Sequence, residues 1–330
     1  MSQSTVLVLG SRGRLGGALV DAFAARGWRV LGQARRTGSS NATTIIADML
    51  DVDRVVREAR AAGVGGVVDV VVNAANPPYT RWAQEAAAMN NAAIAIATAL
   101  GATLMLPGNV YNYGADLPAE LRSDTAQHAQ TKKGKIRIAM ERAMATAAEQ
   151  GTQAIVVRAG DFFGCGVGSW FDQAIAKDIP SGKVTYPGPL DEVHAWAYVP
   201  DLAATFARVA AARQSLARFE TIHFAGYALT GREFVAAIER VTGRAMNVAG
   251  LPWPLIRVGG LVVPIWRELA EMAYLWRRPH RLLTDAAHGE LIAPATPFDA
   301  AISESLDALH PQWMASISGT ENDVIPVLDQ

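Results

Sequence analysis

Residues Thr5-Val-Leu-Val-Leu9 run directly into Gly10-Ser-Arg-Gly13-Arg-Leu-Gly16, and a helical stretch follows from Leu15 to Ala25. An apolar strand, three glycines at this spacing and a helix are what the pyrophosphate of a dinucleotide requires. Gly10 allows the tight turn, Gly13 lets the backbone approach the phosphates, and Gly16 lets the helix pack closely. The free N–H groups at the start of the helix, at Arg14 and Leu15, would point at the anion. We therefore predict a dinucleotide-binding loop here; a glycine-rich structural turn is the alternative.

Short β-branched runs alternate with longer alanine-rich runs over the first half of the chain, which indicates a parallel sheet covered on both faces. The predicted strands are Thr5–Leu9, Trp28–Gly32, Thr44–Ile46, Val67–Asn73, Thr103–Leu106 and Ala154–Arg158. The predicted helices are Leu15–Ala25, Val52–Ala62, Arg81–Leu100 and Ile136–Gln150. The fold class is therefore α/β, a doubly wound parallel sheet of the Rossmann type. Ligands of such sheets bind at the carboxyl ends of the strands.

The regular alternation is lost after Arg158, where glycine, proline and aromatic residues become frequent. A strand at Thr221–Ala225 and helices at Thr230–Thr242, Trp266–Trp276 and Asp299–Leu309 are expected there. We predict a dinucleotide-binding domain over 1–160 with a returning segment at about 195–225. About 161–194 and 226–330 would then form a smaller substrate lobe.

Composition excludes several classes of protein. Hydrophobic residues make up 50% and charged residues 18% of the chain, and the net charge is -1. This gives no electrostatic basis for binding nucleic acid or an anionic membrane. The apolar stretch 251–266 is interrupted by Arg257 and three prolines. It is too short for a membrane span, and an interfacial segment is the alternative. A single cysteine, Cys165, and the absence of a signal peptide favour a cytoplasmic protein. No bound metal is predicted.

The end of the second strand tests the identity of the cofactor. In NAD-binding sheets an acidic residue usually accepts a hydrogen bond from the ribose 2′-OH there. This strand instead runs into Gly32-Gln-Ala-Arg35-Arg36 and has no carboxylate. Two guanidiniums, with Arg12 of the glycine loop, would suit a 2′-phosphate. We predict NADP as the cofactor, with NAD less favoured; arginines that only solvate a loop are the alternative.

The ends of the next two strands carry further candidates for the cofactor site. Asp48 follows the third strand and would accept from the adenine amino group. Asn73, Ala74 and Ala75 follow the fourth, where small side chains leave room for the adenosine. Each alone is more often a cap or loop residue, but together they mark consecutive strand ends.

With these residues the chain resembles the extended short-chain dehydrogenase/reductase family, in its NAD-dependent epimerase/dehydratase branch. The resemblance further includes Met89-Asn90, Val110-Tyr111, Val157-Arg158-Ala-Gly-Asp161-Phe-Phe-Gly164 and His194-Ala-Trp-Ala-Tyr-Val-Pro-Asp201. It implies that Asn90 and Arg158 belong to the cofactor site and that Asp161 and His194 border the substrate. It also implies a homodimer through the helices 81–100 and 136–150.

The family's catalytic pair is where the chain departs from the pattern. The family uses Tyr-x-x-x-Lys on the helix after the fifth strand, where the lysine lowers the tyrosine pKa. Here the helix from Thr131 contains no tyrosine, and Pro107 stands where a hydroxyl residue is expected. If Lys135 is the family lysine, Thr131 replaces the tyrosine. If Glu141 marks the register, Lys133 and Arg137 take the two places.

Two phenols on the adjacent loop could move the proton instead. Tyr111 and Tyr113 are candidates, as is a water held by Asn109; aromatic packing under the nicotinamide is the alternative. The leading hypothesis is an NADP-dependent oxidoreductase acting on a small carbonyl, carbinol or sugar-like substrate. The alternatives are a catalytically silent NADP(H)-binding sensor and a nucleotide-sugar epimerase or dehydratase.

Overall fold

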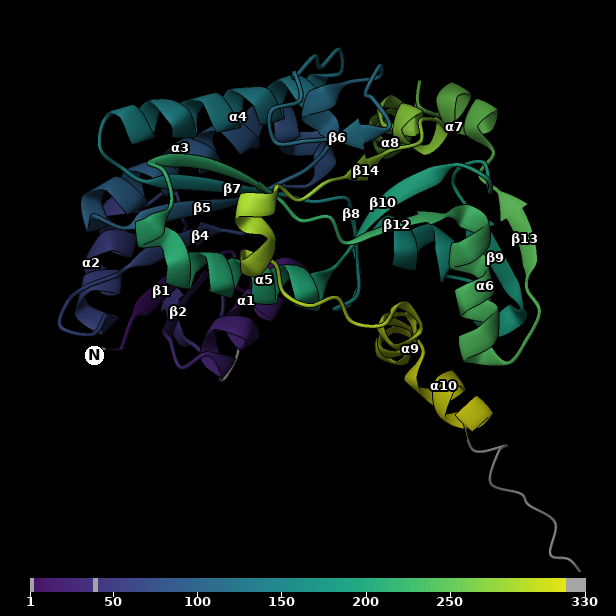
Figure 1. Ribbon diagram of the computed structural model, residues 1–330, viewed down its shortest axis with the longest axis horizontal. Coiled ribbons are helices and arrows are strands. Elements are labelled where there is room, and N and C mark those ends of the chain that lie inside the picture. Colours follow the sequence, from purple (N-terminus) through teal and green to yellow (C-terminus); the bar gives the residue numbers. More distant parts are fainter. Residues whose placement is uncertain (1–2, 38–40, 319–330) are drawn as a thin grey trace, which may run out of the picture.

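The computed structural model describes residues 3–37 and 41–318. Seven strands form one parallel sheet in the order β11-β7-β5-β4-β1-β2-β3 (Figure 1). Their bounds are β1 Thr5–Leu9, β2 Arg29–Ala34, β3 Thr43–Ile46, β4 Val70–Asn73, β5 Thr103–Gly108, β7 Ala154–Arg158 and β11 Phe219–His223. The order reverses between β1 and β4, so a crevice opens at their carboxyl ends. This confirms the predicted doubly wound parallel sheet.

Helices cover both faces of the sheet, as the continuous burial of β1 and β7 requires. On one face lie α2 Val52–Ala62, α3 Trp82–Leu100 and α4 Lys132–Glu149, and on the other lie α1 Arg14–Ala25 and α5 Val199–Ala212 (Figure 1). Each face has its own apolar core. The inward positions of α3 are largely alanine, and α3 packs side by side with α4.

Most predicted elements of this domain begin and end within two residues of the bounds that the sequence indicated, and the largest difference is in α4. It was expected from Ile136 but begins at Lys132, because the Thr131 hydroxyl accepts a hydrogen bond from the N–H of Gly134 and caps the helix one turn earlier. Strand β11 also begins two residues before the predicted Thr221, where Phe219 pairs with Ala154 of β7.

The smaller lobe contains short strands that the sequence analysis did not predict. β8 Asp161–Phe163, β10 Val193–Tyr198 and β12 Tyr227–Thr230 form one sheet, and β9 Lys183–Tyr186 pairs with β13 Asn247–Gly250. The helices are α6 Gly231–Thr242, α7 Trp253–Gly259, α8 Pro264–Glu271, α9 Phe298–Leu309 and α10 Pro311–Ser318. The predicted helix 266–276 is split, because a 3-10 turn replaces its second half. An aromatic core around Phe163, Trp196 and Phe234 holds the lobe together.

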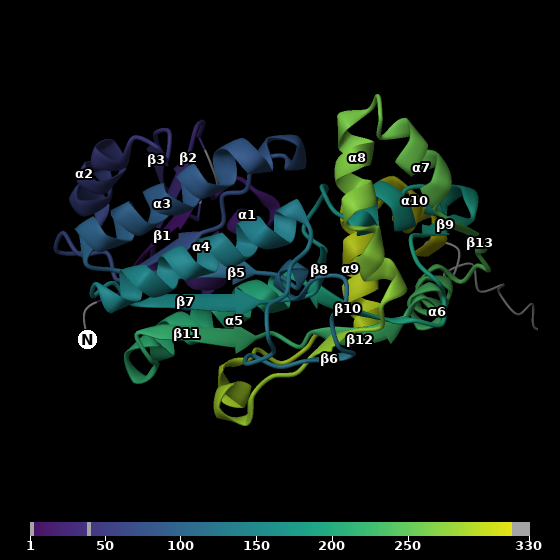
Figure 2. The same cartoon turned by 90° about the horizontal axis from the view of Figure 1, so that it is seen from above.

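The chain crosses between the two parts more often than the predicted boundaries imply. β10 lies in the small sheet, whereas α5 and β11 return to the central one. A later segment then runs back over the first domain (Figure 2). There β14, Arg281–Leu282, pairs with β6, Glu120–Leu121, and a 3-10 helix at Ala286–Leu291 packs on α5. The dinucleotide-binding domain is therefore completed by residues from the last fifth of the chain.

Candidate functional site

A cavity of about 1740 Å³ lies at the carboxyl ends of β1, β2, β4 and β5 and extends to the smaller lobe. The glycine loop forms one wall. Residues 251–269, which include α7 and α8, contribute to the opposite wall. A large cavity thus lies at the strand ends beside the predicted loop, where ligands of such sheets bind.

The glycine loop has the geometry that a phosphate cradle needs. Gly10 has φ 74°, and a Cβ on it would lie 2.7 Å from the Cα of Ala75. A Cβ on Gly16 would lie 2.2 Å from the carbonyl oxygen of Gly10, so the helix packs on the loop itself. No side chain caps the N-terminus of α1 at Gly13, which leaves its N–H groups available to an anion. The residues present therefore fit a dinucleotide pyrophosphate.

Three arginines surround the cavity at the end of β2. Arg12, Arg35 and Arg36 line it and are exposed, and Arg12 donates a hydrogen bond to the carbonyl of Thr37. Within residues 3–37 and 41–318, no carboxylate forms an ion pair with any of them. Gln33 is fixed between the N–H of Gly10 and the carbonyl of Ala47. This end of the cavity therefore carries positive charge and no acid to accept from a ribose.

The predicted adenosine residues also line the cavity. Asp48 lies at its edge, with one carboxylate oxygen accepting from the N–H of Leu50 at 3.0 Å. Asn73 is buried, and its Oδ1 has no hydrogen-bond partner among the described side chains and backbone. Ala74 and Ala75 leave space beside it. An unpaired buried acceptor at a cavity wall is a position where a ligand N–H or O–H is stabilising.

Helix α4 presents Lys133 and Arg137, not Thr131 and Lys135, toward the interior. Thr131 is the cap, and Lys135 is exposed. Arg137 lines the cavity, donates to the carbonyl of Pro107 at 3.1 Å and stacks on the Trp82 ring with its guanidinium carbon 4.9 Å from the centroid. Burial lowers the pKa of Arg137 below its usual range. The geometry argues against the Thr131/Lys135 register, because a capping hydroxyl and an exposed lysine do not reach the cavity.

Lys133 is held by two carboxylates from the smaller lobe. Its Nζ lies 2.5 Å from Glu268 and 2.6 Å from Glu271, both on α8, and only 1% of its side chain is exposed. It also lies 5.4 Å from the centroid of the Tyr79 ring. Glu271 further accepts from the backbone N–H of Lys132 and Lys133, at the positive end of the α4 dipole. Lys133 therefore joins the two parts of the molecule and does not line the cavity itself.

A pair of phenols lies at the cavity wall next to Arg137. The hydroxyls of Tyr111 and Tyr79 are 2.9 Å apart, and both residues line the cavity. Burial raises the pKa of Tyr111 well above its usual value, and burial also raises that of Tyr79. Both phenols are therefore protonated near neutral pH and can donate hydrogen bonds. Asn109 lies beside them, with its Oδ1 accepting from the N–H of Tyr111.

The predicted substrate residues divide between the cavity and its surroundings. Asp161 lines the cavity, and its Oδ2 lies 2.8 Å from Nε2 of His194. His194 is behind it, stacked on Trp276 at 4.2 Å, and does not line the cavity. Arg14 lines the cavity, and its buried Nη1 lacks a hydrogen-bond partner among the described residues. Burial lowers the pKa of Arg14, opposed by the charge of Asp172.

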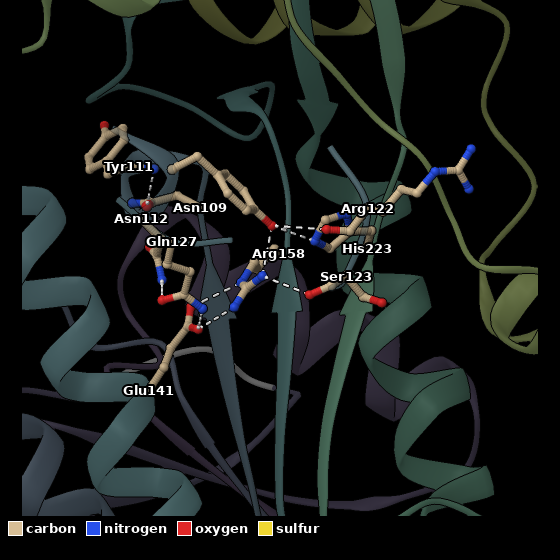
Figure 3. A network of polar contacts seen from close by, with 10 residues as sticks. Asn109, Tyr111, Asn112, Arg122, Ser123, Gln127, Glu141, Arg158 and His223 are labelled. Atoms are coloured by element: carbon tan, nitrogen blue, oxygen red, sulfur yellow. Dashed lines mark hydrogen bonds and ion pairs between the residues drawn. The ribbon is translucent and has the colours of Figure 1, made fainter. Parts of the chain in front are cut away.

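Three further predicted site residues lie outside the cavity because other groups of the protein bind them. Arg158 forms a buried ion pair with Glu141 at 2.6 Å and donates to the Tyr113 hydroxyl at 2.7 Å (Figure 3). Tyr113 also bonds to His223 at 2.8 Å. Asn90 donates to the carbonyl of Met140, between α3 and α4. These contacts argue against roles for Arg158 and Asn90 at the cofactor and for Tyr113 in proton transfer.

The sequence analysis missed Tyr79, Trp82 and the apolar wall from Leu251 to Leu269 as parts of the site. Tyr79 could have been found, because it follows the fourth strand after Asn73, but only the first three positions after that strand were considered. The apolar wall gave no such signal, since its residues read as ordinary packing. None of the described helices is long and apolar enough to cross a membrane. The described part of the chain also contains no His, Cys, Asp or Glu cluster suited to a metal ion.

Comparisons with known proteins agree with this arrangement. Residues 6–224 match the model of the NAD dependent epimerase/dehydratase family. The UDP-glucose 4-epimerase of Thermotoga maritima, solved with UDP-glucose, shows 14% identity and a TM-score of 0.71, covering 93% of this chain and 99% of that chain. The UDP-N-acetylglucosamine 4-epimerase of Bacillus cereus shows 13% identity and a TM-score of 0.72, covering 93% and 100%. The dTDP-glucose 4,6-dehydratase of Bacillus anthracis, in complex with NAD, shows 12% and 0.71, covering 95% and 99%. No curated protein matches the chain.

Proposed function

Since the chain belongs to the NAD dependent epimerase/dehydratase family, we propose that it is an oxidoreductase that uses NADP(H) on a small carbonyl or carbinol substrate. The observation that supports NADP(H) is the group of Arg12, Arg35 and Arg36 at the end of β2, which lacks an acidic partner. Guanidiniums pair with a 2′-phosphate by charge-assisted hydrogen bonds. The Bacillus anthracis dehydratase, solved in complex with NAD, is only 12% identical to this chain, so its cofactor does not decide the choice.

The residues around Arg137 suit reduction better than oxidation. The nicotinamide supplies the hydride when NADPH is bound. The raised pKa values of Tyr111 and Tyr79 mean that both phenols stay protonated near neutral pH and do not act as bases. The two hydroxyls share one hydrogen bond, and the one that accepts it can donate its proton to a carbonyl oxygen. Arg137, fixed on Pro107 and Trp82, keeps a positive charge next to the phenols and stabilises the negative charge that develops on that oxygen.

A second candidate function is an NADP(H)-binding sensor without catalysis. It is favoured by Lys133, which takes the family's tyrosine position if Glu141 marks the register and which is bound by Glu268 and Glu271. In this reading the helix that normally carries the catalytic pair connects the domain to the lobe, and cofactor binding is transmitted through that connection. A nucleotide-sugar epimerase or dehydratase is the third candidate. The homodimer through α3 and α4 and the cytoplasmic location stay predictions.

Replacing Arg35 tests the cofactor. Arg35→Ala should weaken NADPH binding about tenfold or more, because a charge-assisted hydrogen bond is lost, and NADH binding should change less than about twofold. Isothermal titration calorimetry with each cofactor measures both. Arg57→Ala, at an exposed arginine of α2 outside the cavity, is the matched control and should change neither. Equal losses for NADPH and NADH would refute the assignment.

Turnover separates the first two functions. If the chain is an oxidoreductase, it consumes NADPH with at least one member of a panel of aldehydes and ketones. The fall in NADPH absorbance measures this consumption. The sensor binds NADPH without consuming it, and hydrogen exchange in α8 changes on binding.

A further inference from the structure

We infer that the ligand next to the cofactor is a neutral, apolar carbonyl compound and not a nucleotide sugar. This inference rests on the proposed function and names the substrate class of the same cavity. It follows from three features: the composition of the lobe wall, the distribution of charge across the cavity and the exposed mouth.

The wall that residues 251–269 contribute is almost entirely apolar. Its lining residues are Leu251, Pro252, Leu255, Ile256, Ile265, Trp266 and Leu269. Trp170 lines the neighbouring part of the lobe wall and contacts Trp253 in the lobe core. A sugar ring needs several hydrogen-bond partners around its hydroxyls, and among the described residues of this wall the only side-chain donor is the indole N–H of Trp266. A hydrocarbon ligand gains binding free energy from such a wall roughly in proportion to the apolar area that it buries.

The positive charges that line the cavity all belong to the first domain. They are Arg14, Arg137, the three arginines at the end of β2 (Arg12, Arg35 and Arg36) and Arg81, which is paired with Glu85. Among the described lobe residues that line the cavity, none is lysine or arginine, and Asp161 is the single charged one. A second diphosphate, as in a nucleotide sugar, would therefore meet a negative charge and no counter-charge on the lobe side.

The polar groups near Arg137 are few and suit one carbonyl. The hydroxyls of Tyr111 and Tyr79 share one hydrogen bond, and the hydroxyl that accepts it can donate its own proton to the carbonyl oxygen. On the lobe side, the Ser169 hydroxyl is already bonded to Asp172 at 2.6 Å. The other polar groups of the described lobe residues that line the cavity are the Asp161 carboxylate, the Gln173 amide and the indole N–H groups of Trp170 and Trp266. A molecule with one polar end and a hydrocarbon body therefore suits the space between Arg137 and the apolar wall.

The mouth of the cavity is apolar as well. Leu255 and Ile265 line the cavity and are still 60% and 41% exposed, and Val167, on the facing loop, is 74% exposed. Apolar side chains thus continue from the inner wall to the surface. Large exposed apolar side chains gathered at one opening are typical of a ligand-binding site. An apolar compound can lose its water shell along this path.

The neutral naphthyl ketone 6-propionyl-2-dimethylaminonaphthalene tests the inference, because its emission shifts to the blue in apolar surroundings. We expect the full-length chain, with and without NADPH, to bind it with this shift. Unbranched 2-alkanones should displace it, each added methylene strengthening competition about threefold. UDP-glucose should not displace it. Leu255→Ser should weaken its binding about fivefold, because an apolar contact with the ligand is lost.

Leu261→Ser is the matched control, since Leu261 lies on the same hairpin, is 85% exposed and does not line the cavity. It should leave the affinity within about twofold, as an exposed side chain makes no contact with the ligand. Displacement by UDP-glucose, or equal losses in both variants, would overturn the inference. If NADPH fails to bind while the ketone still does, the cofactor proposal fails alone, since the titration without NADPH measures the ligand class separately.

Discussion

Helix α4 carries two ion-paired sites on one side, and they differ in what they connect. At its first turn, Lys133 binds Glu268 and Glu271 of the smaller lobe, whose side chains are each 20% exposed. Two turns later, Glu141 binds Arg158 of β7, and both are almost fully buried. The first site joins two parts of the molecule, and the second lies within one domain.

The difference shows how one helix serves two purposes. The Arg158 site is completed by a hydrogen bond that Arg158 donates to the Tyr113 hydroxyl and by one that Gln127 donates to Glu141, so its charges are satisfied without water (Figure 3). The Lys133 site keeps contact with solvent through its glutamates, so it can separate at lower cost. We therefore expect the inner site to govern global stability and the outer site to govern the position of α8.

The largest effect is expected at the inner site. Arg158→Leu leaves the Glu141 carboxylate buried without a counter-charge, so the free energy of unfolding should fall by about 3–5 kcal/mol. Urea unfolding measures it. Arg240→Leu breaks the exposed pair with Asp299 and should cost less than about 1 kcal/mol. Adding Glu141→Leu to Arg158→Leu should restore part of the lost free energy of unfolding. If Arg158→Leu alone is as stable as the wild type, the inner site does not govern global stability.

The inner site should also respond to acid. The Nδ1–H of His223 donates to the carbonyl of Leu121, so its Nε2 accepts from Tyr113. Burial, and then the charge of Arg158, lower the pKa of His223 to about 4. Between pH 6.5 and 4 the unfolded chain binds a proton that the folded chain does not. The contribution of His223 to the free energy of unfolding is therefore complete above pH 6.5 and decreases as the pH falls. At pH 5 the loss is about 2 kcal/mol.

Urea unfolding at pH 7 and pH 5, with His223→Gln as the reference, isolates this contribution. The variant lacks the titrating group, so its stability should depend less on pH by that amount. His280, whose pKa burial lowers to about 3, titrates in both chains and cancels in the difference. Equal pH dependence in the two chains would show that His223 is not kept neutral by the fold.

A smaller effect on stability is expected at the outer site than at the inner one. Lys133→Met leaves two glutamates that are each 20% exposed and can turn toward water, so the free energy of unfolding should fall by about 1–2 kcal/mol. Hydrogen exchange by mass spectrometry should show faster exchange in α8 and little change in β7. If exchange increases equally in both, the two sites are not independent, and α4 acts as one unit.

The sequence allowed the cofactor end of the site to be predicted because its chemistry is local. The spacing of Gly10 and Gly16 by itself indicates the loop. The arginines follow β2, whose end was predicted to within a few residues. Strands such as Thr5–Leu9 were equally clear, since a buried parallel strand is a continuous apolar run.

The substrate end could not be predicted in the same way because its parts meet only in the folded chain. Lys133 and Glu271 are separated by 138 residues, and neither residue type indicates the other. The strands of the lobe are three to six residues long and rich in aromatic and glycine neighbours, which hid their periodicity. Arg158 was assigned to the cofactor by resemblance alone, and the buried carboxylate of Glu141 decides its position instead.

The pairing of β14 with β6 has a consequence for synthesis of the chain. On the ribosome, Glu120 and Leu121 emerge about 160 residues before Arg281 and Leu282, the strand that covers their edge. Until then α5 also lacks the helix at 286–291 that packs on it. A nascent chain ending at residue 224 has the whole central sheet but not its final cover. The first domain is therefore synthesised early but completed late. Its uncovered strand edge is the part where a chaperone would be needed in the meantime.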